Sequence, residues 1–504
     1  MAQYKISDIT NIFWAMNDGF KAGRDPMGVQ NSSVATYSCL LPGMTNLTGH
    51  IRYYSLYCWL LKEYDDLEKN GQTKLHQYNF IRRAELIMAF VMKDQNVNSV
   101  VGAYYVSTHR DVIDGNGYYN IADGADYESK DRYWTFKSGA FGQYYLGSLI
   151  QYGLIKVEEN RFYLRNNGKA LASSFVYSVD EDTRELFLDC ILDGNISENE
   201  ITELLPIGLH QIVVDSEEWK SLNQLLTQVD EGDSSLRRQT VYLMLKDIEE
   251  GVPFSDYLKH RFESYRDNDC EAAFGWYFYY LCETLHYIIE TIFCLVLNEI
   301  DELKNPPVEV LLEKSTKDVL SYLEEERLYS DIAEWMDDCK NDIVSQFTEI
   351  RDSIKCAEYS KAVALSLPLL LCLYNEYCKK KEVIDDFENK YDLKRQRGIL
   401  SKGLDSYVKC YLSLTPREYI LALIKQVMNE HTVVAVAKMG NSNVDLRKFL
   451  LENGHAVLVE QRYPNLTSPR IESLHNFLID LGYIAKDNTL TTVAKQFIEE
   501  YGKE

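Results

Sequence analysis

Hydrophobic and polar positions follow the same plan in two stretches that lie far apart in the chain. In residues 146–172 an amphipathic helix ends at Gly153, two short strands flank a polar turn, and another helix begins. Residues 474–497 repeat this order, with the first helix ending at Gly482. Glycine suits the left-handed position that ends many helices. Each stretch therefore predicts the helix–hairpin–helix end of a winged-helix module.

Most of the remaining chain shows apolar residues at helical spacing. We predict helices over residues 51–64 and 80–92, and an almost wholly helical region over 179–390. The residues around 111–127 are rich in Asp, Gly and Asn, which indicates an irregular loop. The most apolar helix, 272–297, contains three ionisable residues, so we interpret it as a buried core helix rather than a membrane span.

Toward the C-terminus the pattern changes within a short distance. Thr415 and Pro416 have the residue types of a helix N-cap and first turn. The β-branched run 432–437 predicts a strand, and residues 444–452 predict a helix. Together with the hairpin ending at Gly482, these elements complete the second predicted winged-helix module.

The patterns together predict a mainly α protein in which two winged-helix-like α+β modules flank an acidic helical middle region. A chain of 504 residues is long enough for several domains. The predicted boundaries are 1–125 for a helical N-terminal domain, 126–178 for the first winged-helix-like module, 179–400 for the acidic helical domain, and 401–504 for the C-terminal winged-helix-like module.

Charge is placed unevenly along the chain. The net charge is −24, but residues 179–359 alone carry −27 and the rest of the chain +3. An acidic segment repels a polyanion, because phosphate contacts depend on Lys and Arg. It is either a solvated helical surface or a docking face for a basic partner. In contrast, residues 130–175 hold seven basic and three acidic residues, so the first module is the better candidate for contact with nucleic acid.

Winged helices read DNA with a recognition helix in the major groove and a hairpin on the backbone, yet they also serve as protein-docking domains. Both uses remain open here. The candidate nucleic-acid-binding residues of the first module are Lys137, Gln143, Tyr144, Lys156, Arg161, Arg165 and Lys169, and those of the second are Arg470, Asn476 and Lys486.

Evidence for catalysis is weak. Glu283–His286 and Glu472–His475 match the Glu-x-x-His spacing of di-iron sites, but such a site needs further glutamates from facing helices. A hydrogen-bonded pair inside the apolar helix is the better account of the first. The Glu-x-Lys at 302–304 lacks the strand context of metal-dependent nucleases. Since no phosphate-binding loop or nucleophile elbow occurs in the sequence, we expect no catalytic residue, metal or cofactor.

The sequence also bears on the compartment. Eleven cysteines without a Cys-x-x-Cys pair fit reduced thiols better than a disulfide framework. The N-terminal residues lack the continuous apolar core of a signal peptide. We therefore expect a cytoplasmic protein with no membrane partner.

The run Leu40-Leu41-Pro42-Gly43-Met44-Thr45-Asn46, followed by Ile51-Arg52-Tyr53-Tyr54-Ser55-Leu56-Tyr57, resembles a pattern near the start of uncharacterised bacterial proteins from phage-defence gene clusters. In those proteins a Leu-Pro-Gly turn precedes an Arg-Tyr-rich helix, and winged-helix-like units follow. The resemblance covers about residues 35–175 and, more loosely, the C-terminus. It implies an accessory subunit of a defence complex. The layout is also similar to kleisin-type partners of SMC-type ATPases, a likeness of architecture only.

We therefore expect a non-catalytic scaffold or accessory subunit of a bacterial antiviral complex. It would bridge a separately encoded ATPase or nuclease, and contact with double-stranded DNA is part of the hypothesis. One alternative is a stand-alone winged-helix regulator that binds DNA through Arg470 and Asn476. A further alternative is a metal-dependent enzyme with a divergent site near Glu283 and His286.

Overall fold

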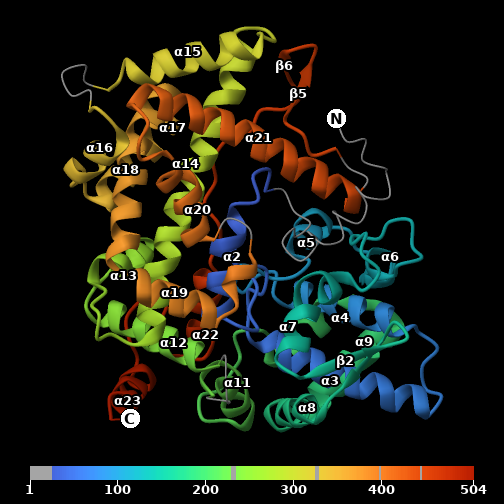
Figure 1. Cartoon of the computed structure of the whole chain (residues 1–504). Helices are drawn as coiled ribbons and strands as arrows, with labels where there is room; N and C mark the ends of the chain where they lie inside the picture. The colour runs from blue at the N-terminus through green and yellow to red at the C-terminus, as the bar shows by residue number, and fades with distance from the viewer. Residues whose placement is uncertain (1–24, 229–233, 324–328, 397–398, 443–444, 504) are drawn as a thin grey trace. The chain divides into compact units, whose positions relative to one another are not determined.

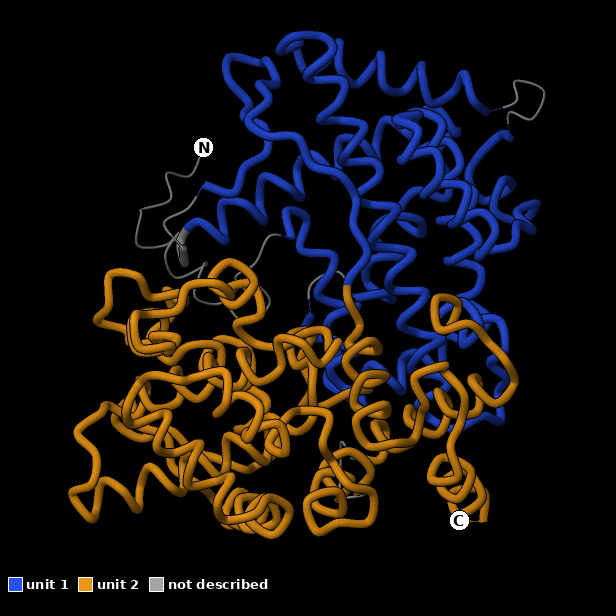
Figure 2. Tube along the Cα trace, turned by 180° about the vertical axis from the view of Figure 1, so that it is seen from behind, with its two compact units in different colours: residues 1–39, 258–467 blue, residues 40–257, 468–504 orange. Residues whose placement is uncertain are grey.

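The computed structural model describes residues 25–228, 234–323, 329–396, 399–442 and 445–503 (Figure 1). Among these residues helices dominate, and strands pair only in two-stranded antiparallel sheets. The expectation of a mainly helical protein is confirmed. The chain divides into two compact units (Figure 2): unit 1 contains residues 1–39 and 258–467, and unit 2 contains residues 40–257 and 468–504. The four-part division expected from the sequence stays a prediction.

Unit 1 is built around one long helix, α14, which packs against α15, α18 and α21. Nearly every residue of α14 is buried, as expected for a helix that is apolar on all sides. The described elements are α2 Gln30–Leu40, α13 Tyr257–Ser264, α14 Glu271–Glu302, α15 Val308–Leu320, α16 Ile332–Asp338, α17 Ile343–Lys355, α18 Tyr359–Lys379, α19 Lys381–Lys390, the 3-10 turns η6 Leu393–Arg395 and η7 Lys409–Tyr411, α20 Leu400–Tyr407, α21 Pro416–Ser442, β5 Phe449–Glu452 and β6 His455–Leu458.

The ionisable residues of α14 pair with one another. His286 lies 3.3 Å from a carboxylate oxygen of Glu283 and 3.6 Å from one of Glu290. Burial disfavours the charged imidazole, but the two carboxylates raise the His286 pKa to about 10. Glu283 also accepts a hydrogen bond from the backbone amide of Thr467, and Glu290 one from the side chain of Gln30 at 2.7 Å. Glu283 and His286 are therefore a buried pair inside α14, as expected, but the contact is an ion pair, since neither ring nitrogen of His286 forms a hydrogen bond with the described residues.

Two helices in the described part of the chain reach the length and apolar composition of a membrane span, α14 and residues 416–439 of α21. The apolar window of α14 is 100% buried inside the protein, and that of α21 is 50% buried. Burial of α14 confirms the prediction that residues 272–297 form a core helix.

The region before the second hairpin differs from its prediction. α21 begins at Pro416 as expected, where Thr415 and Glu418 exchange hydrogen bonds in a capping box. The predicted strand 432–437 is wrong, because these β-branched residues continue α21, whose Val434 and Ala435 are buried. The predicted helix 444–452 is also wrong: residues 449–452 form strand β5, and residue 444 lies outside the described residues.

Unit 2 is built around α3, which packs against α4, α8 and α11. The described elements are α3 Arg52–Lys69, α4 Gln77–Val91, α5 Ala103–His109, β1 Tyr118–Asn120, α6 Ile121–Ala125, the π-helical turn η2 Phe141–Tyr145, α7 Leu146–Gln151, β2 Ile155–Glu158, β3 Arg161–Leu164, α8 Asn166–Ser178, α9 Glu181–Asp193, β4 Asn195–Ser197, α10 Glu198–Glu203, the 3-10 turns η3 Leu205–Ile207 and η4 Phe254–Asp256, α11 Glu217–Thr227, α12 Ser234–Glu249, α22 Ile471–Asp480 and α23 Thr492–Tyr501.

The prediction of an irregular loop at 111–127 is wrong for residues 118–125, which form strand β1 and helix α6. Strand β1 pairs with β4, which comes much later in the chain, and Tyr119 lies opposite Ile196 in the register. Both of these side chains are buried, and helix α6 follows β1 directly. The pairing depends on a partner far away in the sequence, so the local pattern did not predict it.

Candidate functional site

Two helix–hairpin–helix repeats lie in unit 2. The first repeat is residues 141–178 (η2, α7, β2, β3 and α8), and the second repeat is residues 471–501 (α22, a turn and α23). In the first repeat β2 and β3 form a regular ladder from Ile155↔Leu164 to Glu158↔Arg161. In the second repeat the hairpin is reduced to one bridge, Ile484↔Leu490. The predicted order of elements is present in both, with a shortened hairpin in the second.

The helix ends of the two repeats share one hydrogen-bond pattern. Gly153 and Gly482 have positive φ of 68° and 72°. In the first repeat the amide of Leu154 donates to the Leu149 carbonyl at 2.9 Å, and in the second the Tyr483 amide makes the equivalent bond at 2.8 Å. This six-to-one bond, with the glycine amide bonding three residues back, defines a Schellman motif. The left-handed glycine caps predicted from the sequence are confirmed.

Both repeats pack on the first turns of α3. The Tyr54 hydroxyl hydrogen-bonds the Ser148 hydroxyl of α7 at 2.6 Å, and the Tyr54 ring lies 6.0 Å from the Phe477 ring of α22. At the end of α22, the Asp480 carboxylate accepts from the backbone amide of Ile51 at 3.1 Å. A carboxylate is favourable at a helix N-terminus because the first amides lack partners there. The start of α3 therefore holds the two repeats together within unit 2.

The Leu-Pro-Gly turn before α3 explains part of this arrangement. Its three carbonyls accept from side chains of three different elements: Leu41 from Arg470 at 2.9 Å, Pro42 from Arg237 at 2.9 Å, and Gly43 from Ser148. Gly43 has φ of 78°, and a Cβ there would lie 2.8 Å from the Tyr152 ring. Only glycine fits this position without strain.

The loop between α6 and η2, residues 126–140, is held by hydrogen bonds to two buried charged residues of α4. Arg82 donates to the carbonyls of Trp134 at 3.0 Å and Phe136 at 2.6 Å. Glu85 accepts from the backbone amides of Ala140 at 3.1 Å and Phe141 at 2.5 Å. Burial raises the Glu85 pKa to about 7, although the Tyr57 hydroxyl and these two amides favour the carboxylate. The loop that carries Phe136, Lys137 and Ser138 is therefore rigidly supported.

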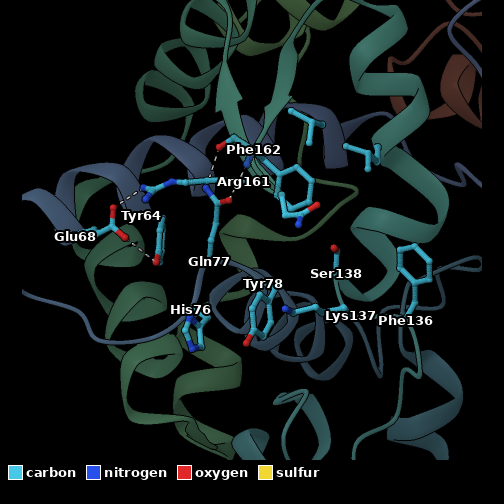
Figure 3. A pocket seen from close by; sticks show the side chains of 13 residues that line it. Tyr64, Glu68, His76, Gln77, Tyr78, Phe136, Lys137, Ser138, Arg161 and Phe162 are labelled. Atoms are coloured by element: carbon cyan, nitrogen blue, oxygen red, sulfur yellow. Dashed lines mark hydrogen bonds and ion pairs between the residues drawn. The ribbon is translucent and has the colours of Figure 1, made fainter.

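A pocket of about 560 Å³ opens between this loop, the β2–β3 hairpin and the ends of α3 and α4 (Figure 3). We call it the aromatic pocket. Its lining residues are Tyr64, Glu68, His76, Gln77, Tyr78, Phe136, Lys137, Ser138, Leu146, Val157, Asn160, Arg161 and Phe162. The side chain of Gln77 joins its walls, since it donates to the Phe162 carbonyl and accepts from the Phe162 amide, each at 2.9 Å.

Two predicted site residues, Lys137 and Arg161, line the aromatic pocket. The Lys137 ammonium lies 4.5 Å from the centre of the Tyr78 ring, a cation–π contact, and has no carboxylate partner among the described residues. Arg161 is already neutralised: its Nη2 donates to Asp65 at 2.9 Å and to Glu68 at 2.5 Å. The pKa of Glu68 is lowered, chiefly by that hydrogen bond. Arg161 therefore supports the pocket wall more than it offers a free charge to solvent.

Two other predicted residues, Tyr144 and Asn476, line a second hollow of about 400 Å³. It lies in unit 2 beside α5 and α22, and Ser473 of α22 donates to the Thr45 carbonyl at 2.9 Å. Thus residues from both repeats meet at this hollow, which the sequence did not indicate.

The remaining predicted residues differ in how they are held. Gln143, Arg165, Lys169 and Lys486 are exposed and form no ion pair with described residues. Lys156 is exposed but pairs with Glu158 at 2.8 Å. Arg470 stands at the left-handed N-cap of α22, and its guanidinium is turned to the Leu41 carbonyl.

Sequence reasoning missed the aromatic walls of the site. Tyr64, Tyr78 and Phe136 were not candidates, since aromatic residues at helical spacing usually form a core. His76 and Tyr78, whose rings stack with their centres 5.1 Å apart, were the available signal, because they stand at the N-cap and in the first turn of the helix that carries Arg82 and Arg83.

The two Glu-x-x-His pairs lie in different units. His475 hydrogen-bonds the Asn488 side chain at 2.8 Å within unit 2, whereas Glu283 and His286 lie in unit 1. No family model, no curated protein and no solved structure matches this chain. A functional proposal therefore rests on the geometry of the two units themselves.

Proposed function

We propose that the chain is a non-catalytic, cytoplasmic accessory subunit of a bacterial antiviral complex, which bridges a separately encoded ATPase or nuclease and contacts nucleic acid. The observation that carries the proposal is the pair of helix–hairpin–helix repeats held on one helix, α3. In this proposal both repeats are winged-helix-like modules: α7 and α22 are the recognition-type helices, and the hairpins after them are the wings.

The charge of the two repeats favours nucleic acid as the partner of the first repeat and a protein as the partner of the second. The first repeat and the loop before it present Lys137, Arg165 and Lys169 without ion-pair partners among the described residues. Phosphate contacts depend on such cations. The second repeat turns Arg470 inward and has a shortened hairpin, which favours a protein partner there. The strongly acidic residues 179–359 keep a duplex away from the middle of the chain.

The alternatives have less support. A stand-alone regulator would read DNA through Arg470 and Asn476, but Arg470 donates to the Leu41 carbonyl. A metal-dependent enzyme would use Glu283 and His286, yet these side chains are buried and already pair with each other. Neither Glu283 nor His286 lines any of the described pockets, whereas Asn476 does line the second hollow.

Co-purification tests the proposal. The full chain, tagged and expressed together with the genes adjacent to its own, is expected to retain an ATPase or nuclease subunit in stoichiometric amount. As a matched control, Leu451→Asp changes an exposed residue of unit 1 and should leave retention unaltered. Substitution of exposed residues on α23, such as Lys495→Glu, should weaken retention. Recovery of the chain alone, with tight site-specific DNA binding, would favour the regulator instead.

A further inference from the structure

We propose that the aromatic pocket binds one unpaired nucleotide, with the base against its apolar wall and the phosphate at Lys137. This deepens the proposed function and rests on its nucleic-acid contact. It predicts that the first repeat recognises an unpaired base in single-stranded or locally opened DNA or RNA, in addition to its phosphate contacts. Figure 3 shows Lys137, Tyr78 and Phe136 on one side of the pocket and the hairpin residues Arg161 and Phe162 on the other.

The dimensions of the pocket fit a single nucleotide. Its volume of about 560 Å³ lies within the range of roughly 300–1,000 Å³ that is typical of small-ligand sites. A base inside an intact duplex cannot enter such a space, because it is stacked between its neighbours and paired with the opposite base. The ligand must therefore present a base that is already unpaired or that is turned out of the helix.

The apolar wall offers surface for a base. Phe136 is 49% exposed and Val157 is 42% exposed, although both line the pocket. Exposed apolar side chains at the rim of a cavity indicate a binding surface more often than scattered ones do. Stacking on an aromatic ring accepts any base, since every base has a π face. His76 and Tyr78, stacked on each other, form a second planar group in the wall.

Polar groups without partners surround this wall. The Lys137 ammonium is held over the Tyr78 ring and has no carboxylate partner among the described residues. Ser138 and Asn160 form no side-chain hydrogen bond with described residues, and the Nε of Arg161 is buried without an acceptor. The Ser138 hydroxyl and the Asn160 amide are therefore left to donate to the acceptors of a ligand, whereas the Arg161 Nε has no accessible surface and stays within the wall. A phosphate and a base edge provide such acceptors together.

The aromatic pocket is preformed, because hydrogen bonds within unit 2 hold its walls in place. Arg82 and Glu85 of α4 fix the loop that carries Phe136 and Lys137, and Gln77 fixes the hairpin through two hydrogen bonds to Phe162. A preformed site loses little ordering entropy on binding. The arrangement therefore supports a specific site rather than a chance hollow.

The test uses the full chain and a short single-stranded DNA in which one central nucleotide is either 2-aminopurine or an abasic site. We expect the base-bearing strand to bind about tenfold more tightly than the abasic strand, which is within the range for one stacked base. Fluorescence of 2-aminopurine should be quenched on binding. Competition with a free deoxynucleoside monophosphate separates a strand-bound nucleotide from a free one as the ligand.

Variants make the assignment specific. Phe136→Ala should weaken binding of the base-bearing strand about tenfold and leave the abasic strand unchanged. Lys169→Gln, outside the pocket, should weaken both strands alike, because it removes a phosphate contact. Tyr177→Ala removes a ring that is 80% exposed and does not line the pocket, so it is the matched control and should change neither.

The outcomes separate this inference from the proposed function. Equal binding of both strands, or equal effects of Phe136→Ala and Tyr177→Ala, overturns the nucleotide site while the phosphate contact of the first repeat stands. If no strand binds at any salt concentration, the nucleic-acid part of the proposed function fails as well. Circular dichroism of each variant checks that the helical fold is retained.

Discussion

The ion pair between Arg52 and Glu218 is predicted to be essential for unit 2. The Arg52 Nε and Nη2 donate to the two carboxylate oxygens of Glu218 at 3.1 and 3.0 Å, and both side chains are only 1% exposed. Ser55 also donates to Glu218 at 2.6 Å, and Arg52 Nη1 donates to the Gly208 carbonyl at 2.5 Å. Glu218→Leu would leave the guanidinium buried with no opposite charge.

Loss of one partner from a buried ion pair destabilises a protein by about 3–5 kcal/mol, because the remaining charge stays desolvated. A domain is stable by only about 5–15 kcal/mol. We therefore expect Glu218→Leu, and likewise Arg52→Met, to remove a large part of the free energy of unfolding of unit 2. The double variant R52M/E218L removes both charges, so it should be less destabilised than the sum of the two single variants.

Hydrogen–deuterium exchange measures the effect where it occurs. Opening free energies of the α3 amides (residues 52–69) should fall by about 3–5 kcal/mol in each single variant. Amides of α14 in unit 1 serve as the internal reference. Single substitutions that each change the α3 opening free energy by less than about 1 kcal/mol, or effects that simply add in the double variant, would refute the reasoning.

Three further predictions follow from buried groups and glycines. The Glu85 pKa is raised from 4.5 to about 7, so its contribution to stability is complete below about pH 4.5 and is lost as the pH rises through 7. Urea unfolding of wild type and Glu85→Gln should therefore diverge by about 3 kcal/mol across that window, and a pH-independent difference would contradict this. Burial lowers the His431 pKa from 6.5 to about 4, so its contribution is present above about pH 6.5 and disappears as the pH falls through 4. His431→Gln should lack this acid-induced loss of about 3 kcal/mol, seen as a flatter profile of unfolding midpoint against pH. Gly153→Ala should destabilise by about 1 kcal/mol because φ is positive, and Gly482→Ala by more, since its Cβ would also lie 3.1 Å from Val214. Equal melting temperatures for the two variants would argue against the second effect.

Helices and their ends were largely predictable from the sequence. The apolar spacing identified α3, α4 and α14, and the glycines at 153 and 482 identified the left-handed helix ends. Such features depend on residues within a few positions of each other, which is why a local pattern carries them.

Features that depend on distant partners were not predictable. The run 432–437 has strand-like residue types but lies within α21, where burial against other helices overrides local propensity. The pairing of β1 with β4 depends on residues far apart in the sequence. Arg470 was a reasonable candidate for DNA contact, yet its guanidinium donates to the Leu41 carbonyl.

The candidate site was partly predictable. Lys137 and Arg161 were identified by the local excess of basic residues, and the structure places both in one pocket. Tyr64 and Tyr78 were not identified as site residues, because a sequence cannot distinguish aromatic residues that line a pocket from those that fill a core. Neutralisation of Arg161 by two carboxylates of α3 is likewise a tertiary effect.

The most direct test of the central claim is the salt dependence of nucleic-acid binding by the full chain. If the first repeat contacts phosphates through free cations, the affinity for single-stranded DNA should fall linearly with salt on logarithmic axes. The slope should become shallower by about 1.4 in R165Q/K169Q, roughly 0.7 for each cation removed. Lys486→Gln, in the second repeat, should leave the slope unchanged. An unaltered slope in R165Q/K169Q, or no binding at low salt, would contradict the account.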